Sequence, residues 1–288
     1  MGEQQNIRRS LLLRTRLAQF FQKRATWSHQ LVQALNVFRD AARRESWEAF
    51  LFGGVPRGLW VHGTRGAVRD FDIVVADDAF NDVLCTFGHC LVKRNRFGGA
   101  KLLIQDCEFD VWPLSKTWAF AEGLFENPSF EALPRTTFLT IDSIVIELAP
   151  RVGIRRRVFQ TGFFRSMSER RLEICLESNP YPELCAIRSL RIAQALGFSF
   201  SPSLAKYISE VICSTSSDLL RQAQSQHYKR IFFDQNELLD IAGRISFQLS
   251  DAGESCVKIF PIQATQTYLW ENSSPMRLPT RLNATNPV

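Results

Sequence analysis

The sequence is poor in the residues that most often build metal and redox centres. It has only four histidines, none of which is spaced from another as a pair of metal ligands. Its seven cysteines are an odd number without any Cys-x-x-Cys spacing, and most of them lie in apolar stretches. We therefore expect reduced thiols in the core rather than zinc ligands or disulfide bonds.

Long apolar runs and internal repeats are also absent from the sequence. The run Leu11-Leu12-Leu13 is short and interrupted by arginine, so it fits neither a signal peptide nor a membrane span. We therefore expect a cytoplasmic protein. The sequence gives no indication of an oligomeric state.

What is present is a globular composition with a basic excess. The 288 residues include 23 phenylalanines, enough apolar volume for one large or two modest domains. The formal net charge of +6 makes phosphate-bearing partners plausible. The basic residues gather in four clusters, Arg8–Arg24, Arg39–Arg44, Lys93–Arg96 and Arg151–Arg171. Each cluster alone is also explained by a solvated helix face.

Periodicity divides the chain into four parts. We predict a basic helical extension over 1–27, a mixed α and β domain over 28–152, a helical domain over 153–253 and a loose tail over 254–288. Ser28 is the expected cap of a helix with one apolar stripe. Strands are predicted at 47–52, 71–75, 89–93, 102–104, 107–113, 138–141 and 144–148, and later helices at 168–176, 182–196, 204–211, 217–233 and 235–249.

The segment Asp70-Phe71-Asp72-Ile73-Val74-Val75, which follows Arg69, organises the rest of the chain. Alternate residues of a strand share a face, so Asp70 and Asp72 point to one side while Phe71 and Ile73 pack on the other. Two neighbouring carboxylates repel unless a cation lies between them, and Mg²⁺ prefers such oxygen ligands. Taken alone, the pair also fits a turn residue and a solvated acid on an edge strand.

A glycine pair precedes this segment by one strand. Gly53-Gly54 ends an apolar strand, and Pro56 with Arg57 follows at the expected start of a helix. A helix start offers backbone N–H groups and a positive dipole end to a phosphate. An ordinary turn is the simpler explanation of a glycine pair in isolation.

A third acid follows in the stretch Cys107–Pro113. Asp106, Glu108 and Asp110 alternate there and could share one face, but only Asp110 is enclosed by Phe109, Val111 and Trp112. An acid among large apolar side chains needs a partner to stay charged. We assign Asp110 as the third carboxylate of the metal site and keep Glu108 as the lesser candidate, with an exposed acidic hairpin as the alternative.

These motifs together resemble a known family. The succession Gly53-Gly54-Val55-Pro56-Arg57, Asp70-Phe71-Asp72 and Phe109-Asp110-Val111 is similar to the head domain of tRNA nucleotidyltransferases and bacterial poly(A) polymerases, in the polymerase β-like nucleotidyltransferase superfamily. The segment Ile187–Phe198 resembles the neck helix that follows that head. The resemblance covers about residues 30 to 210 in the right order. It implies an α+β fold, in which a small mixed sheet flanked by helices is followed by an all-helical neck-like domain.

The resemblance also implies roles for individual residues. Asp70, Asp72 and Asp110 would hold Mg²⁺, with Asp110 helping to activate an attacking hydroxyl. Gly53 and Gly54 would line the triphosphate of an NTP such as ATP, and Arg57 would support that pocket. Arg188 and Arg191 would face the nucleotide from the neck. Thr140-Ile141-Asp142 would stand where the family carries Thr-Ile-Asn.

Two departures from the family pattern bear on the substrate. Gly58 stands where the family usually has an aspartate. The acidic pair and arginine with which tRNA nucleotidyltransferases select C and A correspond here to Tyr181-Pro182 and Cys185. These side chains cannot reproduce bidentate polar recognition of a base.

The leading hypothesis from the sequence is a Mg²⁺-dependent nucleotidyltransferase that moves an NMP from an NTP to a hydroxyl acceptor and releases pyrophosphate. An RNA 3′ end is the favoured acceptor, and Arg155–Arg157 and Lys93–Arg96 would contact its phosphates. A protein side chain or another nucleotide is the alternative acceptor. A catalytically silent nucleotide-binding module and a helical partner-binding protein with an incidental Asp-x-Asp are the competing classes.

Overall fold

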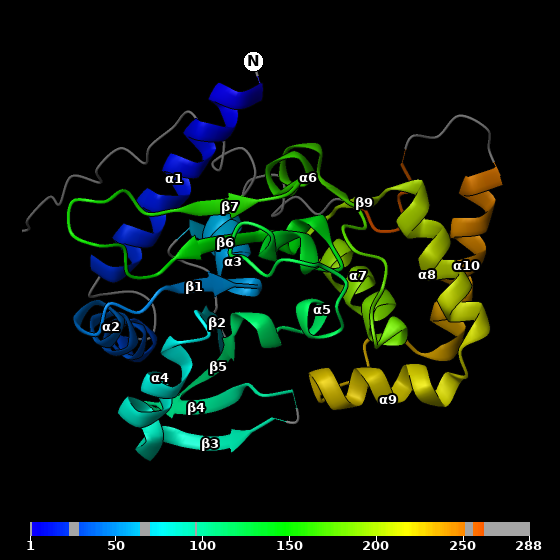
Figure 1. Ribbon diagram of the computed structural model, residues 1–288. Helices are drawn as coiled ribbons and strands as arrows, with labels where there is room; N and C mark the ends of the chain where they lie inside the picture. The colour runs from blue at the N-terminus through cyan, green and yellow to red at the C-terminus, as the bar shows by residue number, and fades with distance from the viewer. Residues whose placement is uncertain (1, 23–28, 64–69, 96, 251–255, 262–288) are drawn as a thin grey trace, which may run out of the picture.

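The computed structural model describes residues 2–22, 29–63, 70–95, 97–250 and 256–261. Within these ranges, seven strands form one mixed sheet, and five helices from the second half of the chain gather beyond one end of it (Figure 1). Ser28, Arg69 and almost all of the predicted tail lie outside the described residues. None of the described helices is both long and apolar enough to cross a membrane.

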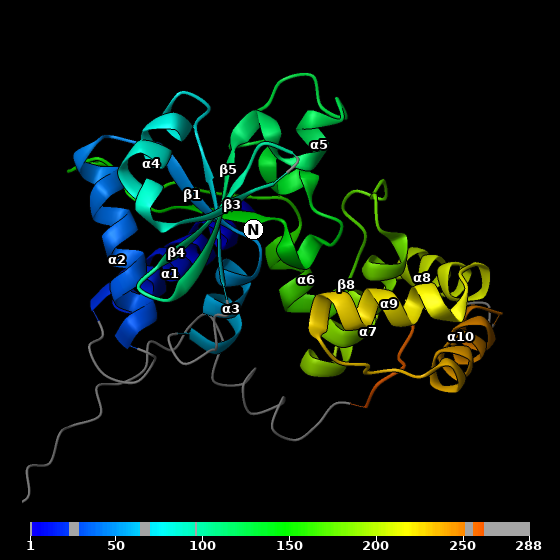
Figure 2. The same cartoon turned by 90° about the horizontal axis from the view of Figure 1, so that it is seen from below.

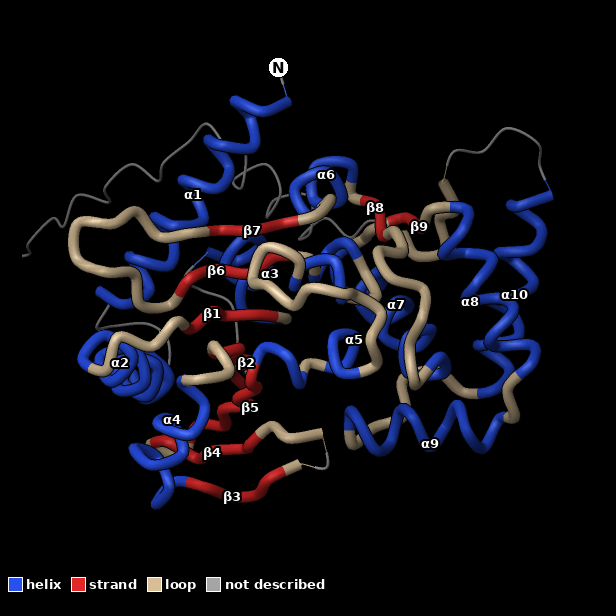
Figure 3. The backbone as a smooth tube through the Cα atoms, viewed as in Figure 1, coloured by secondary structure: helices blue, strands red, loops and turns tan. Residues whose placement is uncertain are grey.

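The sheet has the strand order β3-β4-β5-β2-β1-β6-β7. Its strands are β1 (Ala49–Phe52), β2 (Asp70–Val75), β3 (Leu91–Arg94), β4 (Ala100–Ile104), β5 (Cys107–Pro113), β6 (Ile144–Glu147) and β7 (Val158–Gln160). Strands β2 and β5 run parallel, and every other neighbouring pair is antiparallel. Figure 3 shows β2 and β5 at the centre of the sheet.

The two faces of the sheet have different coverings. The helices α1 (Gly2–Gln22), α2 (His29–Arg44), α3 (Gly54–His62) and α4 (Ala79–Phe87) share one hydrophobic cluster with Phe71, Ile73 and Phe109. On the other face, Phe50 and Val74 pack with α5 (Trp118–Ala121) and the 3-10 turn Leu133–Thr136. Successive strand side chains point to opposite faces of the sheet. Because these strands carry apolar residues at both sets of positions, both faces of the sheet are buried.

The later helices form the second part of the molecule. They are α6 (Phe163–Glu169), α7 (Pro182–Leu196), α8 (Pro202–Ser214), α9 (Ser217–Tyr228) and α10 (Gln235–Ser250), with β8 (Arg171–Leu172) and β9 (Ser199–Phe200) paired beside them. Figure 2 shows α7 to α10 on the opposite side of the sheet from α2 and α4. Gly197 ends α7 with φ 64°, a conformation that glycine adopts without strain.

This architecture confirms the predicted fold class, a mixed sheet flanked by helices and followed by a helical region. Most predicted elements occur within a few residues of their expected bounds. The Gly53-Gly54 pair joins β1 to α3, as expected. Ser201 caps α8 by accepting a hydrogen bond from the Leu204 N–H.

Two predicted elements were wrong, and a third was too long. Residues 138–141 are not a strand, because Leu139 forms an isolated bridge and Thr140–Asp142 is a 3-10 turn. Residues 168–176 are not a helix, because α6 ends at Glu169 and β8 follows. The helix expected over 217–233 ends at Tyr228, where Lys229 adopts a left-handed conformation. In the first two cases the Leu139–Ile174 bridge and the pairing of β8 with β9 outweigh the local pattern.

The sheet also continues past the predicted domain boundary at residue 152. Strand β7 pairs with β6 in register Val145 to Phe159, so Arg155 and its neighbours lie in a hairpin connection. The division into 1–27, 28–152, 153–253 and 254–288 stays a prediction.

Candidate active site

Two of the predicted acids lie side by side at the centre of the sheet. In the parallel pairing of β2 and β5, Asp72 is the partner of Asp110 and Asp70 is the partner of Glu108. Neighbouring strands are about 4.8 Å apart, so Asp72 and Asp110 present their carboxylates next to each other on one face. Asp70, two residues before Asp72, lies on this same face. All three aspartates are half-buried.

The glycine turn lies directly against this pair. Phe52, the last residue of β1, is the register partner of Asp72, and Gly53 follows with φ 66°. A Cβ atom at Gly53 would lie 2.6 Å from Asp72 Oδ2, far inside contact distance. Gly53 is therefore required both by its backbone conformation and by the closeness of the carboxylate. Gly54 begins α3, so the first turn of this helix starts at the same place.

The electrostatics of Asp72 follow from this placement. Burial, and then the charges of Asp70 and Asp110, raise the pKa of Asp72 to about 7. The nearby Arg188 acts in the opposite direction but does not outweigh them. Such a carboxylate is poised to gain from a cation.

Lys101 supplies one positive charge at the edge of the site. Its strand β4 pairs with β5 so that Lys101 is the register partner of Asp110. Lys101 Nζ lies 3.3 Å from Asp110 Oδ2 and 2.7 Å from Glu108 Oε2. Sequence reasoning did not find this residue. The signal was its position opposite Asp110 in the predicted hairpin, which needs the register to be read.

A buried ion network joins two predicted nucleotide-binding arginines. Asp142, with a side chain 8% exposed, pairs with Arg57 of α3 through Oδ1 and with Arg188 of α7 through Oδ2, the latter at 2.9 Å. Burial alone would raise the pKa of Asp142, but Arg57 and Arg188 outweigh it and hold the pKa below its ordinary value. Through Asp142, the start of α3 and the middle of α7 are tied together beside Asp72.

The remaining predicted site residue, Arg191, lies farther along α7 than Arg188. Arg191 stacks on the Phe232 ring at 3.5 Å and donates a hydrogen bond to Gln194, so its described contacts are with the helical region. Cys185 is buried, and burial raises the pKa of its thiol to about 12. A neutral buried thiol and the exposed Tyr181 offer no charged pair for reading a base, as the sequence indicated.

The donor chemistry of the three aspartates suits Mg²⁺. All candidate ligands are carboxylate oxygens, which a hard divalent cation prefers, and burial followed by the charges of Asp70 and Asp110 raises the pKa of Asp72, so a cation would favour its ionised form. In the described ranges, however, no three acidic, histidine or cysteine side chains converge into a closed ligand cluster. The residues therefore fit an ion that is held by two adjacent carboxylates and leaves positions open for phosphate oxygens and water.

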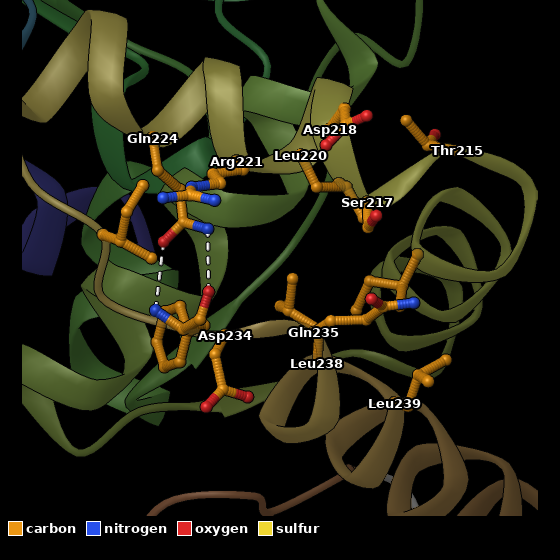
Figure 4. Close-up of a pocket in the computed structure, with 13 residues that line it drawn as sticks. Thr215, Ser217, Asp218, Leu220, Arg221, Gln224, Asp234, Gln235, Leu238 and Leu239 are labelled. Atoms are coloured by element: carbon orange, nitrogen blue, oxygen red, sulfur yellow. Dashed lines mark hydrogen bonds between the residues drawn. The ribbon is translucent and has the colours of Figure 1, made fainter.

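A cavity of about 530 Å³ lies elsewhere, among α8, α9 and α10. Figure 4 shows Gln224 at its wall, where the amide group donates to the Phe233 carbonyl and accepts from the Phe232 and Phe233 N–H groups. These bonds fix the connection between α9 and α10. None of the predicted site residues lines this cavity.

Solved structures show where this fold occurs. The chain is similar to the Thermotoga maritima CCA-adding enzyme complexed with tRNA, with a TM-score of 0.56 and 16% identity over 81% of this chain and 54% of that one. A CCA-adding enzyme with CTP gives a TM-score of 0.57 and 15% identity over 80% and 55% of the two chains. A complex with ATP gives a TM-score of 0.52 and 18% identity over 76% and 53%.

The comparisons confirm the resemblance at the level of the fold. This chain spans little more than half the length of the CCA-adding enzymes it matches. No family model matches its sequence, and no curated protein is similar to it in sequence. The shared architecture is the head sheet followed by a helical region.

Proposed function

We propose that this chain is a Mg²⁺-dependent nucleotidyltransferase that transfers an NMP from an NTP to a hydroxyl acceptor, with an RNA 3′ end as the favoured acceptor and pyrophosphate as the second product. The observation that carries the proposal is the adjacency of Asp72 and Asp110 on parallel strands, with the backbone of Gly53 against Asp72. The fold shared with CCA-adding enzymes supports the same reaction class.

The proposed roles follow from position. Asp72 and Asp110 hold the metal, and Asp70, on the same face of β2, supports them. Gly53 and Gly54 admit the triphosphate to the first turn of α3, which has no side-chain cap and whose N–H groups point away from the helix. Arg57 and Arg188, fixed by Asp142, neutralise phosphate charge, and Arg191 contacts the nucleotide from farther along α7.

In the reaction, the acceptor hydroxyl oxygen forms a bond to the α-phosphorus while the bond from that phosphorus to the bridging oxygen breaks and pyrophosphate leaves. Mg²⁺ held by Asp72 and Asp110 would stabilise the negative charge that develops during the transfer. Asp110 would accept the proton that the attacking hydroxyl loses as the new bond forms. Arg57 and Arg188 are held in place before the substrate arrives, so little reorganisation is needed.

The acceptor is the open part of the proposal. The CCA-adding structures are complexes with tRNA, CTP or ATP, which favours RNA and a nucleotide as substrates here. The buried Cys185 and exposed Tyr181 disfavour templated CCA addition, because they offer no charged hydrogen-bonding pair for the base. A protein side chain or another nucleotide is the alternative acceptor.

The test is incubation of the full chain with Mg²⁺ and each labelled NTP, with and without total RNA. We expect pyrophosphate release and label on RNA. Label on the protein or on a nucleotide would identify that molecule, and not RNA, as the acceptor. Metal-dependent NTP binding without pyrophosphate release would indicate a catalytically silent nucleotide-binding module.

Matched variants test the site assignment. Asp72→Asn and Asp110→Asn should lower turnover by more than the roughly 100-fold that follows loss of an outer-shell partner. Glu108→Gln should retain activity, because Glu108 is 52% exposed and pairs with Lys101. Mg²⁺ should raise the melting temperature of the wild-type chain but not of the two aspartate variants. Full activity of either aspartate variant would refute the assignment.

A further inference from the structure

A second concave surface lies between α1 and β7, separated from β1 by β6. Its volume is about 730 Å³, and its lining includes Arg14 of α1 and Arg155 of the β6–β7 connection. Figure 1 shows α1 running beside β7. We call this surface the basic groove; its lining residues are Asn6, Ile7, Ser10, Arg14, Glu131, Arg155, Val158, Phe159 and Gln160.

Further arginines interact electrostatically with Arg14 and with its neighbours. Burial lowers the pKa of Arg14, and the charge of Arg155 lowers it further. Burial also lowers the pKa of Arg156 to about 10, with further lowering from Arg43, Arg39 and Arg14. Positive charges from α1, α2 and the β6–β7 connection therefore act on one another, although these segments are far apart in the sequence.

The nearby acids cancel only part of this charge, because Asp40 is ion-paired with Arg39 at 2.8 Å but, among the described residues, neither Arg14 nor Arg155 forms such a pair. Glu147 acts on both Arg14 and Arg156, but it is ion-paired with Arg157 at 2.6 Å, and Glu48 is paired with Arg157 at the same distance. Arg14 Nε is buried without a hydrogen-bond partner in the described part of the chain. Glu131 is the acid among the groove residues themselves. Like charges held together in this way are stabilised by a bound anion.

We propose that the basic groove binds phosphate groups of a single-stranded RNA, with Arg14 and Arg155 as the primary contacts. Arginine forks bind phosphate oxygens in a bidentate manner, and two arginines on separate elements along one groove suit successive phosphates of a strand better than one compact anion. Arg157 is excluded from this role because both Glu48 and Glu147 hold it.

The location is consistent with a strand that also reaches the candidate active site. Strand β7 of the groove pairs with β6, β6 pairs with β1, and Phe52 of β1 lies beside Asp72. The three strand spacings from β7 to β2 amount to about 14 Å. RNA binding in the basic groove does not depend on the proposed function. The further statement that this RNA is the acceptor rests on the proposed function.

The test measures binding of a fluorescent single-stranded RNA to the full chain at several salt concentrations. The double variant Arg14→Gln/Arg155→Gln should reduce the slope of log affinity against log salt by about 1.4, because each phosphate contact on a single strand contributes about 0.7. Glu131→Gln should tighten binding about threefold, because it removes a repelling charge. The control Arg221→Gln changes an exposed arginine of α9 and should have no effect on the slope.

A single variant provides the same test in case the double variant does not fold. Arg155 is exposed, so Arg155→Gln alone should fold and still reduce the slope by about 0.7. Unchanged RNA affinity and slope in both variants would overturn the proposal. If these variants lose binding of pyrophosphate but keep that of RNA, the groove is a small-anion site and the proposal is also wrong. Asp72→Asn separates the two hypotheses, because it should abolish pyrophosphate release and keep RNA binding.

Discussion

At the residue scale, the charge state of Asp72 links the fold to metal binding. Burial and the neighbouring Asp70 and Asp110 raise its pKa from 3.8 to about 7. The folded protein therefore binds more protons than the unfolded chain between these values, and the stability contributed by Asp72 is fully present below pH 3.8 and lost as pH rises through about 7. A cation at the site reverses this loss.

We predict a pH-dependent affinity for Mg²⁺. Below pH 7 the metal must displace the proton of Asp72, so its affinity should fall about tenfold for each pH unit. The measurement is the Mg²⁺ concentration that gives half of the rise in melting temperature, taken from pH 5.5 to 8. Asp72→Asn should show no metal-induced rise, and a wild-type affinity that does not change with pH would contradict the prediction.

Asp142 is the second residue whose charge contributes measurably to the stability of the fold. We predict that Asp142→Ala lowers the free energy of unfolding by about 3 kcal/mol, because it leaves the guanidinium groups of Arg57 and Arg188 without their shared partner. Urea denaturation measures the change. Glu210→Ala breaks an exposed pair with Lys206 and should lower it by less than about 1 kcal/mol.

The pH dependence of Asp142 has the opposite sign from that of Asp72. Its pKa is lowered in the folded protein, so its contribution to stability is present above its unfolded pKa and is lost as pH falls.

In the urea experiment, equal losses of unfolding free energy in the Asp142→Ala and Glu210→Ala variants would show that the Arg57–Asp142–Arg188 network contributes little to stability.

At the element scale, the connection from β1 to α3 depends on Gly53, whereas Gly58 inside α3 tolerates substitution. We predict that Gly53→Ala lowers the free energy of unfolding by about 1–3 kcal/mol, because φ is 66° and the new Cβ would meet Asp72 Oδ2. Gly58→Ala, in the same helix and with open space around it, should raise it by about 0.5–1 kcal/mol. Thermal and urea denaturation of both variants test the contrast, and equal effects would refute it.

The elements also show what sequence patterns determine. Alternation in 70–75 and 107–113 predicted the shared face of Asp70 and Asp72 and the strand that carries Asp110, because a strand's faces follow from its period of two. The pairing of β2 with β5 and the position of Lys101 depend on register between separate strands, which no local pattern contains. Asp142 lies in a 3-10 turn whose place is set by ion pairs with distant arginines.

At the scale of the whole molecule, the N-terminal helix belongs to the main hydrophobic core. Leu13 and Leu17 of α1 are fully buried in the cluster that also contains residues of α7, α8 and α10. The sequence predicted this helix from its leucines but placed it at the periphery. Its burial required the contact with α3, which is not visible in the α1 sequence.

We predict that Leu17→Ala lowers the free energy of unfolding by about 2–5 kcal/mol, because it leaves a cavity in this core. Leu11→Ala, at a position that is 51% exposed in the same helix, should change it by less than about 0.5 kcal/mol. Urea denaturation of both variants measures the difference. A small effect at Leu17 would mean that α1 does not contribute to the stability of the core.

The parallel pairing of β2 with β5 also limits how the length of this protein can vary. One residue inserted into β5 before Asp110 would turn its carboxylate to the opposite face, into the aromatic cluster of Phe71 and Phe109. Two inserted residues would restore the face but displace the carboxylate by about 7 Å, beyond the reach of Asp72. Insertions and deletions in related proteins should therefore fall in the connections outside these two strands.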